Sequence, residues 1–547
     1  MRLNPYISKS LKAVFTVCFV FLTSCNSRNV SEYPDVYSEN QVAVSDEGMV
    51  VSAASLATSA GAAIMNDGGN AVDAAVATAF ALSVVEPSMS GLGGRSQILI
   101  KTPEGEFYGI DGTTLVPSGF DPDVHTPGSY GYGTVAIPGT VAALCELLDR
   151  FGTMPLEDVI KPAITYAEEG FELPLEEAER IAGRRDDLLE FDGSRKHFLK
   201  EDCNPYEAGE LFVQPALANT LRLISGGGAD EFYHGSIARK IVKEMETQGG
   251  YVGFEDIQNY STEDALVVHG SYRNMNLTGT YRPASGATVI HILQMMEHFN
   301  LPGLIDSPEW ISVTAQALIL GIADRRRDAA LIVSKEWAKE RAIEIQILET
   351  PVYENGNIIE VNAGMDYTTH LSAADREGWI VSINQSIGPS MGSAVASEEL
   401  GFLYAATMGY LGSLPPGTRA TTSMSPLIAS DNNDIYVFGA AGGIRIITSI
   451  VLTISRILDQ HLLLPEAMAA PRFHASGSTV HIENLHDIYW DTDMHTAMEN
   501  YGWDVNFPTS RGYFGRIHGI WLNKRDGFFT GVADPRWNGE AKSPDNN

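Results

Sequence analysis

Basic residues are scarce in this chain. Among its 547 residues, 37 are lysine or arginine and 69 are aspartate or glutamate, so the formal net charge is −32. A surface with this balance repels nucleic acid, which we therefore exclude as a partner, and it is strongly hydrated. Hydrophobic residues make up 44% of the sequence, which at this length is enough to bury a large core. Disorder is therefore excluded for the body of the chain.

Cysteine is scarce too, with four residues in the whole chain. Cys18 and Cys25 lie near the N-terminus. Cys145 and Cys203 can either pair in an oxidising compartment or remain as buried free thiols. Their spacing matches no metal-binding motif and the histidines are scattered, so the sequence predicts no metal site and no cofactor.

The apolar run near the N-terminus, residues 13–22, is too short to span a bilayer. Basic residues precede it, as in a secretory signal. It ends in Leu22-Thr23-Ser24-Cys25, which resembles the processing site of a bacterial lipoprotein. We expect residues 1–24 to be a removable signal and Cys25 to carry a lipid. The alternative is an ordinary cleaved signal in which Cys25 is incidental.

Residues 25–45 are mostly polar and irregular, as expected of a tether between an acylated cysteine and a folded domain. The sequence therefore predicts an exported protein that a lipid anchors in the bacterial cell envelope, facing the periplasm or the cell surface.

Hydrophobic periodicity predicts both helices and strands. Helical spacing marks six segments: 55–65, 71–85, 155–160, 162–169, 307–333 and 444–458. Alternation or short apolar runs predict strands in four others: 96–101, 107–110, 379–387 and 434–439. The stretch from 140 to 350 is predicted to be mainly helical, so periodicity alone indicates a mixed α and β protein.

The most informative stretch is Met365-Asp366-Tyr367-Thr368-Thr369-His370-Leu371-Ser372. Two threonines followed by an alternating apolar run place a hydroxyl group at the start of a strand. Cleavage of the Tyr367–Thr368 bond would give Thr368 a free α-amine beside its own hydroxyl, and the amine can serve as the general base that a hydroxyl nucleophile needs. The plainer interpretation is two β-forming residues that open a strand.

Motifs on both sides of Thr368 resemble the γ-glutamyltransferases (glutathione hydrolases), which are self-cleaving N-terminal nucleophile hydrolases. The motifs follow the family order over most of the chain: Gly68-Gly69-Asn70-Ala71-Val72-Asp73-Ala74-Ala75, Val85-Glu86-Pro87, Ser90-Gly91-Leu92-Gly93-Gly94, Val135-Ala136-Ile137-Pro138-Gly139-Thr140, Pro283-Ala284-Ser285-Gly286, Thr422-Ser423-Met424-Ser425-Pro426, Ala441-Gly442-Gly443-Ile444-Arg445, Ala470-Pro471-Arg472-Phe473-His474 and Ala533-Asp534-Pro535-Arg536.

The resemblance implies an α+β fold, the four-layer αββα sandwich, built from two fragments of one precursor: 46–367 and 368–547. It implies Thr368 as nucleophile, Ser386 as the hydroxyl that hydrogen-bonds it, and the N–H groups of Gly442 and Gly443 as the oxyanion hole. Ser386 can instead be a strand serine that faces solvent. The glycine pair can also be a tight strand-to-helix turn, and both roles can hold together.

Substrate recognition departs from the family pattern. Thr113 stands where the family has the arginine that clamps the substrate α-carboxylate, while Thr422 and Ser423 retain the two hydroxyls that contact the same group. Three further substrate-binding positions of the family also differ: Gly388, Thr407 and Tyr410. Arg95 is a possible substitute for the missing arginine, or else a surface arginine at a strand start.

The resemblance thus implies an amide hydrolase or acyltransferase that acts on small-molecule amides, with glutathione and γ-glutamyl amides as default substrates and water or an amino acid as acceptor. The first alternative is a family member with another acyl specificity, an acylase or amidase. The second is a catalytically silent binding lipoprotein. The resemblance further implies that the two fragments stay together as a heterodimer.

Overall fold

The computed structural model describes residues 34–346, 366–411, 414–485, 488–490, 492–510 and 512–544. Cys25 and the predicted signal lie outside these ranges, as does the start of the predicted tether. From Tyr33 onward the chain forms one compact unit. Among the described helices, none has the length and apolar character needed to cross a bilayer.

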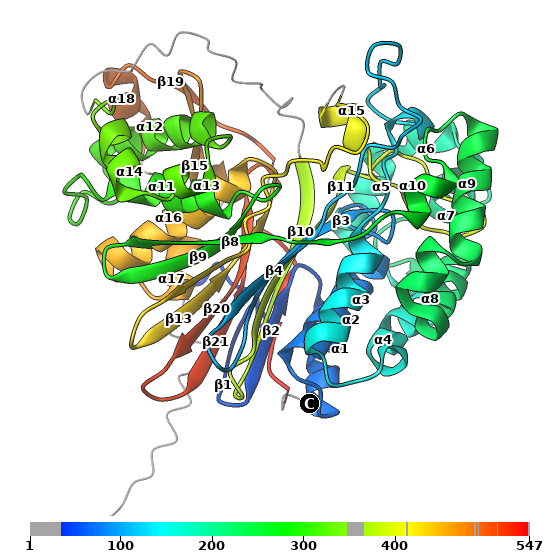
Figure 1. Ribbon diagram of the computed structural model, residues 1–547. Helices are drawn as coiled ribbons and strands as arrows, with labels where there is room; N and C mark the ends of the chain where they lie inside the picture. The colour runs from blue at the N-terminus through cyan, green and yellow to red at the C-terminus, as the bar shows by residue number, and fades with distance from the viewer. Residues whose placement is uncertain are drawn as a thin grey trace, which may run out of the picture. The chain divides into compact units, whose positions relative to one another are not determined.

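Two antiparallel sheets form the centre of this unit (Figure 1). The first sheet has seven strands in this order: β22 (Glu540–Lys542), β2 (Gly48–Ser52), β10 (Asp366–Asp375), β11 (Ile380–Pro389), β3 (Arg95–Lys101), β4 (Phe107–Gly112) and β7 (Glu263–Asp264). The second has eight, with β14 (Ala440–Ala441) paired to β20 beside the main order: β1 (Val42–Ser45), β21 (Phe528–Ala533), β20 (Arg516–Asn523), β13 (Asp434–Phe438), β12 (Leu427–Ser430), β9 (Met275–Tyr281) and β8 (Leu266–Tyr272).

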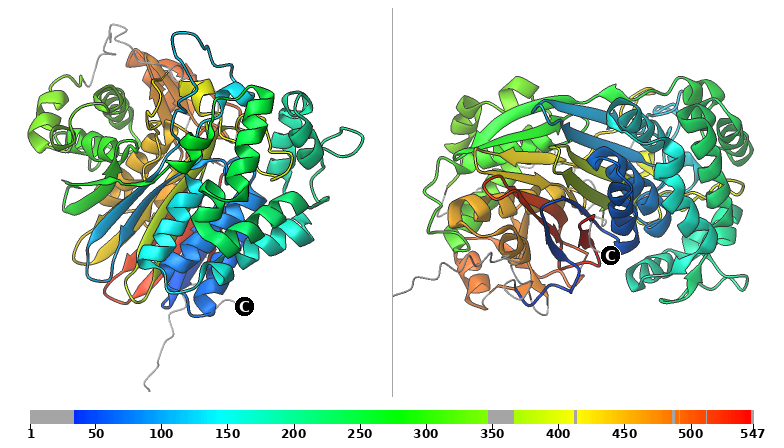
Figure 2. Two further views of the ribbon diagram at one scale, coloured as in Figure 1. Left: turned by 45° about the vertical axis from the view of Figure 1, so that its right-hand side comes forward. Right: turned by 90° about the horizontal axis from the view of Figure 1, so that it is seen from below.

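Three hydrophobic clusters show how the layers stack. One joins the first sheet to the helices on its outer face, and a second does the same for the second sheet. The third lies between the sheets and contains Leu99 and Ala374 from one and Val437 and Ile520 from the other. Figures 1 and 2 show helices outside both stacked sheets. The predicted αββα sandwich is therefore confirmed.

The helices separate into two layers. Those on the first sheet's side are: α1 (Ser55–Asn66), α2 (Ala71–Val85), α3 (Thr140–Phe151), α4 (Leu156–Glu169), α5 (Leu175–Gly183), α6 (Arg185–Leu189), α7 (Asp192–Phe198), α8 (Pro215–Tyr233), α9 (Ser236–Gln248) and α10 (Phe254–Gln258). Those on the second sheet's side are: α11 (Gly286–Met296), α12 (Pro308–Asp324), α13 (Ala329–Ile332), α14 (Lys335–Ala342), α16 (Arg445–Gln460), α17 (Leu464–Ala469) and α18 (Thr492–Asn500). The smaller elements, some of which form separate small sheets, are these: η2 (Tyr132–Thr134), α15 (Thr407–Leu411), β5 (Phe171–Glu172), β6 (Leu211–Phe212), β15 (Phe473–Ser476), β16 (Thr479–Ile482), β17 (Asn484–Leu485), β18 (Ile488–Tyr489) and β19 (Asp504–Asn506).

Helix α2 packs behind the strand that carries Thr368, and every one of its residues is buried. Its start is set by a capping box: the Asn70 side chain accepts the N–H groups of Val72 and Asp73, and the Asp73 carboxylate accepts the Asn70 N–H at 2.8 Å. The two helices predicted at 55–65 and 71–85 are confirmed, because capping and apolar composition are local signals.

Two helix predictions were wrong in their boundaries. The two short helices expected at 155–160 and 162–169 form the single helix α4, which contains Pro162. Pro162 has no N–H to donate to the Asp158 carbonyl, but Asp158 is exposed, so water can donate to that carbonyl instead. The buried residues Val159, Ile160 and Ala163 keep the helix packed on both sides of this position. The pattern at 307–333 is interrupted: α12 ends at Asp324 and α13 is separate.

The stretch from 140 to 350 was predicted to be mainly helical, but it also contains the β8–β9 hairpin, which forms one edge of the second sheet. Cys145 and Cys203, which the sequence allows either to pair or to remain free, are both free thiols, and Cys145 is buried while Cys203 is partly exposed. Burial raises the pKa of the Cys145 thiol to about 12.

Candidate active site

The predicted cleavage point lies in a β-bulge. Strands β10 and β11 pair antiparallel, with Tyr367 opposite Gly388 and Thr369 opposite Gln385. Two residues of β11, Ser386 and Ile387, therefore face the single residue Thr368. Thr368 is only 5% exposed. The bulge leaves this residue out of the regular ladder and gives it a local geometry unlike that of its neighbours.

Ser386 contacts the bond that is predicted to break. Its Oγ donates to the carbonyl oxygen of Tyr367 at 2.8 Å and accepts the N–H of Gly388 at 2.9 Å. Ser386 is 1% exposed, so its interpretation as a solvent-facing strand serine is wrong. Gly388 has φ of +93°, where a side chain would strain the backbone. Position 388 thus supplies an N–H to Ser386 rather than a side chain.

The Gly442–Gly443 pair lies between β14 and the start of α16, with φ of +124° and +59°. No described residue accepts a hydrogen bond from either N–H. A Cβ on Gly442 would lie 2.9 Å from the Cα of Gly515, so a larger residue does not fit. Asn384 Nδ2 donates to the Ala440 carbonyl at 2.8 Å, which ties β11 to the strand leading into this turn. The pair is therefore a strand-to-helix turn with two unused donors.

The predicted substrate residues are mostly engaged within the protein. Thr113 is fully buried, and its Oγ1 donates to the Ala420 carbonyl at 2.8 Å. Thr407, also fully buried, shares a hydrogen bond of 2.8 Å with Thr114. Neutral threonine hydroxyls, each hydrogen-bonded within the protein, therefore occupy two positions where the resemblance implies charged ligands. The side chain of Tyr410 is outside the described residues.

The remaining predicted contacts lie in two places. Thr422 and Ser423 are half-buried in the loop before β12, where Thr422 Oγ1 accepts the Met424 N–H at 3.2 Å. Arg95 is 5% exposed and is the cross-strand partner of Ser386, so it lies on the same face of the sheet. Its interpretation as a surface arginine is wrong, since the side chain is buried beside the predicted catalytic serine.

Two further buried arginines, which the sequence did not single out, surround Tyr367. The Cζ of Arg180, on α5, lies 5.8 Å from the centroid of the Tyr367 ring. Arg180 and Arg516, at the start of β20, each place Cζ 4.0 Å from the centroid of Trp537. Burial raises the pKa of the Tyr367 phenol, while Arg180 and Arg516 act in the opposite direction.

Glu86, at the end of α2, and Glu177, which is ion-paired with Arg180, are acidic groups of this cluster. Burial and the neighbouring Glu177 raise the pKa of Glu86 to about 7. Burial and the neighbouring Arg180 lower the pKa of Arg516 to about 10. In the sequence, only the Val85-Glu86-Pro87 motif points to a member of this cluster. Positions 180, 516 and 537 are far apart in the chain, and no sequence pattern relates them.

In the part of the chain that the structure describes, no group of three His, Cys, Asp or Glu residues is placed to hold a metal ion. His370 hydrogen-bonds Ser372 at 3.0 Å, and His291 contacts Asp324 at 3.3 Å. Both histidines therefore have local partners.

Two stacked antiparallel sheets between helical layers, with a threonine hydroxyl at the start of a central strand, define the N-terminal nucleophile hydrolases. Two solved structures agree with this class. The cephalosporin acylase from Bacillus halodurans aligns with a TM-score of 0.85 and 26% identity, covering 94% of this chain and 99% of that one. The γ-glutamyltranspeptidase of Helicobacter pylori aligns with a TM-score of 0.53 and 31% identity, covering 56% of this chain and 95% of that one.

The family model described as gamma-glutamyltranspeptidase matches residues 57–543, so the chain belongs to this family. The acylase ACY 1 proenzyme of Pseudomonas sp. (strain SE83) is 31% identical over 489 residues, 83% of this chain and 87% of the relative. The glutathione hydrolase proenzyme of Pseudomonas sp. (strain A14) is 29% identical over 515 residues, 86% and 87% of the two chains. The predicted family is confirmed, and the protein is an enzyme of the N-terminal nucleophile hydrolase type.

Proposed function

We propose that this protein is a self-processing amide hydrolase or acyltransferase whose acyl-enzyme forms on Thr368. The observation that carries the proposal is the bulge in which Ser386 Oγ donates to the carbonyl oxygen of Tyr367 beside the buried Thr368. Both Pseudomonas relatives are named as proenzymes, which is consistent with a precursor that must be cut.

Processing would begin when Thr368 Oγ1 attacks the carbonyl carbon of Tyr367. The Ser386 hydroxyl would stabilise the developing oxyanion, the C–N bond would break, and the acyl group would move from the Thr368 nitrogen to its oxygen. Water would then hydrolyse this ester, leaving a carboxylate on Tyr367 and a free amine on Thr368. The products balance, because one water is consumed for one peptide bond broken.

The mature site would use the new amine as its base. The amine takes the proton of Thr368 Oγ1 as the oxygen attacks a substrate amide, and it returns the proton to the departing amine. The N–H groups of Gly442 and Gly443 would receive the oxyanion, since their donors are otherwise unused. Water or an amino acid would then release the acyl group.

The two fragments, 46–367 and 368–547, would remain together as a heterodimer. Strands β10 and β11 of the second fragment lie between β2 and β3 of the first, and β1, β8 and β9 of the first complete the other sheet. Separating the fragments would break both sheets and leave their backbone N–H and C=O groups without partners, which is costly.

The acyl group is the second part of the proposal. One candidate acyl group is the γ-glutamyl group of glutathione and related amides, as the name of the glutathione hydrolase relative suggests. The alternative is another acyl group, as the name of the acylase relative suggests. The hydrogen bonds that occupy Thr113 and Thr407 favour the alternative, because neither position offers a charge to a zwitterionic glutamyl group. We therefore favour an acyl group without the α-amino acid head.

A panel of three p-nitroanilides tests this specificity: γ-glutamyl, glutaryl, which lacks only the α-ammonium group of glutamate and keeps its carboxylate, and butanoyl, which lacks both. Losing a bidentate arginine from a desolvated pocket costs about 2 to 4 kcal/mol. We therefore expect kcat/KM for the γ-glutamyl compound to be about thirty- to a thousandfold below that of the best substrate. Efficient turnover of the γ-glutamyl compound would contradict this expectation and favour γ-glutamyl amides as the substrates.

A catalytically silent binding lipoprotein is the remaining alternative. Such a protein has no need of Thr368, Ser386 and the Gly442–Gly443 pair together, and here all four lie at neighbouring strand ends. A denaturing gel distinguishes the two hypotheses: the proposed enzyme should give two fragments, whereas a catalytically silent protein should remain a single chain.

Membrane attachment through Cys25 is a further proposal, supported by the Leu22-Thr23-Ser24 run before it. Cys25→Ala should move the protein from the membrane fraction into the soluble exported fraction, because a lipid chain is what would hold a folded domain of this polarity at a bilayer. Cys203→Ala, which changes a different free thiol, serves as the control and should leave fractionation unchanged. Retention of the Cys25 variant in membranes would mean that another anchor exists.

A further inference from the structure

The loop that leads into β12 carries two of the predicted substrate contacts, Thr422 and Ser423. Its described part, residues 414–426, belongs to no helix or strand. A loop without a ladder of its own is held by bonds to neighbouring elements. Two anchors hold this one, and both reach from the predicted second fragment, 368–547, to residues of the first, 46–367.

One anchor is at Thr422 itself. Its N–H donates to the Pro283 carbonyl at 2.9 Å, and its carbonyl accepts the Ser285 hydroxyl at 2.8 Å. The Ser285 N–H donates to the Met424 carbonyl at 2.9 Å. Pro283 and Ser285 join β9 to α11, so this anchor fixes the loop to the second sheet and its helices.

Arg419 is the other anchor. Its Nη1 lies 3.1 Å from Asp111 Oδ2, its Nε lies 2.8 Å from Glu263 Oε1, and its Nη2 donates to the Ser261 carbonyl at 2.6 Å. Asp111 is on β4 and Glu263 is on β7, which form one edge of the first sheet. All three guanidinium nitrogens have partners within the protein, so Arg419 is placed to hold the loop and not a substrate.

The pair with Asp111 is the buried part of this anchor. The side chain of Asp111 is 3% exposed and that of Arg419 is 16% exposed, whereas that of Glu263 is 64% exposed. Burial raises the pKa of Asp111, and Arg419 acts in the opposite direction. Removing Arg419 would leave a buried carboxylate without its cation, which costs far more than losing the exposed pair with Glu263.

Backbone hydrogen bonds beside the pair do not replace it. The Ala420 N–H donates to the Thr114 carbonyl at 3.0 Å, which joins the loop to residues 113–116. These residues lie beyond the end of β4 and have no strand of their own. The Arg419–Asp111 pair reaches back to β4 and therefore ties both segments to the sheet.

Asp111 belongs to a row of polar cross-strand partners that crosses the first sheet. The row contains, from β10 to β7: His370, Asn384, Gln97, Asp111 and Glu263. Neighbouring strands are about 5 Å apart, so Asp111 lies about 15 Å across the sheet from the strand that carries Thr368. Asn384, in the same row, donates to the Ala440 carbonyl before the Gly442–Gly443 turn. The row therefore relates the loop, the nucleophile and the predicted oxyanion donors to one frame.

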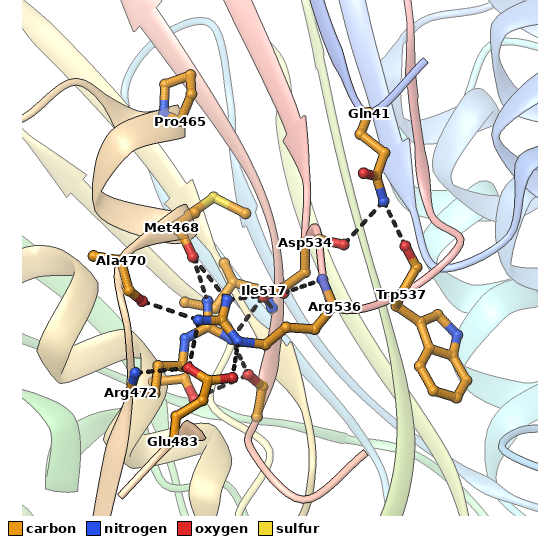
Figure 3. Close-up of polar contacts among 12 residues, drawn as sticks. Gln41, Pro465, Met468, Ala470, Arg472, Glu483, Ile517, Asp534, Arg536 and Trp537 are labelled. Carbon is orange, nitrogen blue, oxygen red and sulfur yellow. Dashed lines mark hydrogen bonds and ion pairs between the residues drawn. The ribbon is translucent and has the colours of Figure 1, made fainter. Parts of the chain in front are cut away.

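A second buried arginine serves as a comparison (Figure 3). Arg536 Nε lies 2.6 Å from Glu483 Oε1, and its Nη2 donates to the Ala470 carbonyl at 2.9 Å. These partners belong to the predicted second fragment, and neither lies in the 414–426 loop. Loss of Arg536 should therefore lower the stability of the whole fold, so self-cleavage and turnover should fall together.

We propose that Arg419 is a positioning residue. Its pair with Asp111 sets the distance between Thr368 and the two hydroxyls of the 414–426 loop, and substrate turnover depends on that distance while self-cleavage does not. This inference rests on the proposed function. Self-cleavage, as proposed, uses groups on β10 and β11 alone, whereas a substrate at Thr368 must reach the loop as well.

The test measures self-cleavage and turnover in the same variants. A shift of about 1 Å in a substrate-positioning group costs about a hundredfold in rate. Arg419→Gln should lower kcat/KM at least about thirtyfold for the best of the three p-nitroanilides, while fragments appear within about threefold of the wild-type rate. Arg419→Lys should recover part of the loss, since it restores the charge without the planar fork. Arg536→Gln should lower both rates alike.

Arg150→Gln is the matched control. Arg150 pairs with Asp264, next to Glu263 on the same edge strand, but its partners lie outside the 414–426 loop. Both rates should stay at their wild-type values. Asp111→Asn should behave like Arg419→Gln, and the double variant should lose no more than about threefold beyond either single one, because the two residues act as a unit.

Hydrogen exchange tests the anchor without any substrate. Exchange in peptides that cover residues 414–426 should speed up at least about tenfold in Arg419→Gln and stay unchanged in Arg150→Gln. Unchanged exchange in Arg419→Gln, or equal slowing of self-cleavage and turnover, overturns the positioning role. If Arg419→Gln does not fold, Arg419→Lys and Asp111→Asn carry the same test, with a loss of at least about tenfold in kcat/KM.

Failure of the proposed function gives a different result. If cut wild-type protein hydrolyses no amide, the proposed function fails, whatever the exchange shows. If the wild type is active and Arg419→Gln is equally active, the proposed function stands and this inference fails.

Discussion

Thr368→Ala is expected to yield a single uncut chain without amidase activity. The substitution removes the hydroxyl that would attack the Tyr367 carbonyl, and without the cut no free amine is produced at position 368. Wild-type protein should give two fragments, and N-terminal sequencing of the smaller should read Thr-Thr-His-Leu-Ser. Activity should fall to background, because both the nucleophile and its base are lost.

The neighbouring threonine provides the matched control. Thr369 is also fully buried in β10, so Thr369→Ala removes a hydroxyl of the same kind one residue away and should still be cut after Tyr367. Thr368→Ser, which keeps the hydroxyl, should be cut more slowly than wild type. Amide hydrolysis by a wild-type chain that stays full length would contradict the mechanism.

Ser386→Ala is expected to slow self-cleavage about a hundred- to a thousandfold, the usual cost of losing one oxyanion donor. The Ser386 hydroxyl is within 2.8 Å of the carbonyl oxygen on which negative charge develops. The measurement is a time course of fragment appearance from freshly purified precursor.

Ser382→Ala is the control for this variant. Ser382 lies on the same strand, is equally buried, and donates to the Phe438 carbonyl at 3.0 Å. Its loss removes a buried hydrogen bond of the same type, so a merely structural effect should be similar in both variants. Equal cleavage rates for the two variants would show that Ser386 has no role in processing.

The structure also changes how the Thr113 substitution is understood. The sequence alone shows that an arginine is absent at position 113, and it offers Arg95 as a substitute. The hydroxyl of the buried Thr113 donates to the Ala420 carbonyl, so position 113 offers no charge to a substrate carboxylate.

Local patterns determined much of this protein from the sequence alone. The capped helix at 71–85, the strand that begins near Thr368 and the glycine turn before α16 follow from apolar periodicity and from residues with special backbone preferences, which act over a few neighbours. The family order of the motifs added the fold and the proposed nucleophile. Only the tertiary structure decided which groups meet: the bulge in which Ser386 donates to the Tyr367 carbonyl, the internal hydrogen bonds of the Thr113 and Thr407 hydroxyls, and the arginines around Tyr367. Those contacts depend on how strands from both predicted fragments stack, and no short-range pattern encodes that stacking.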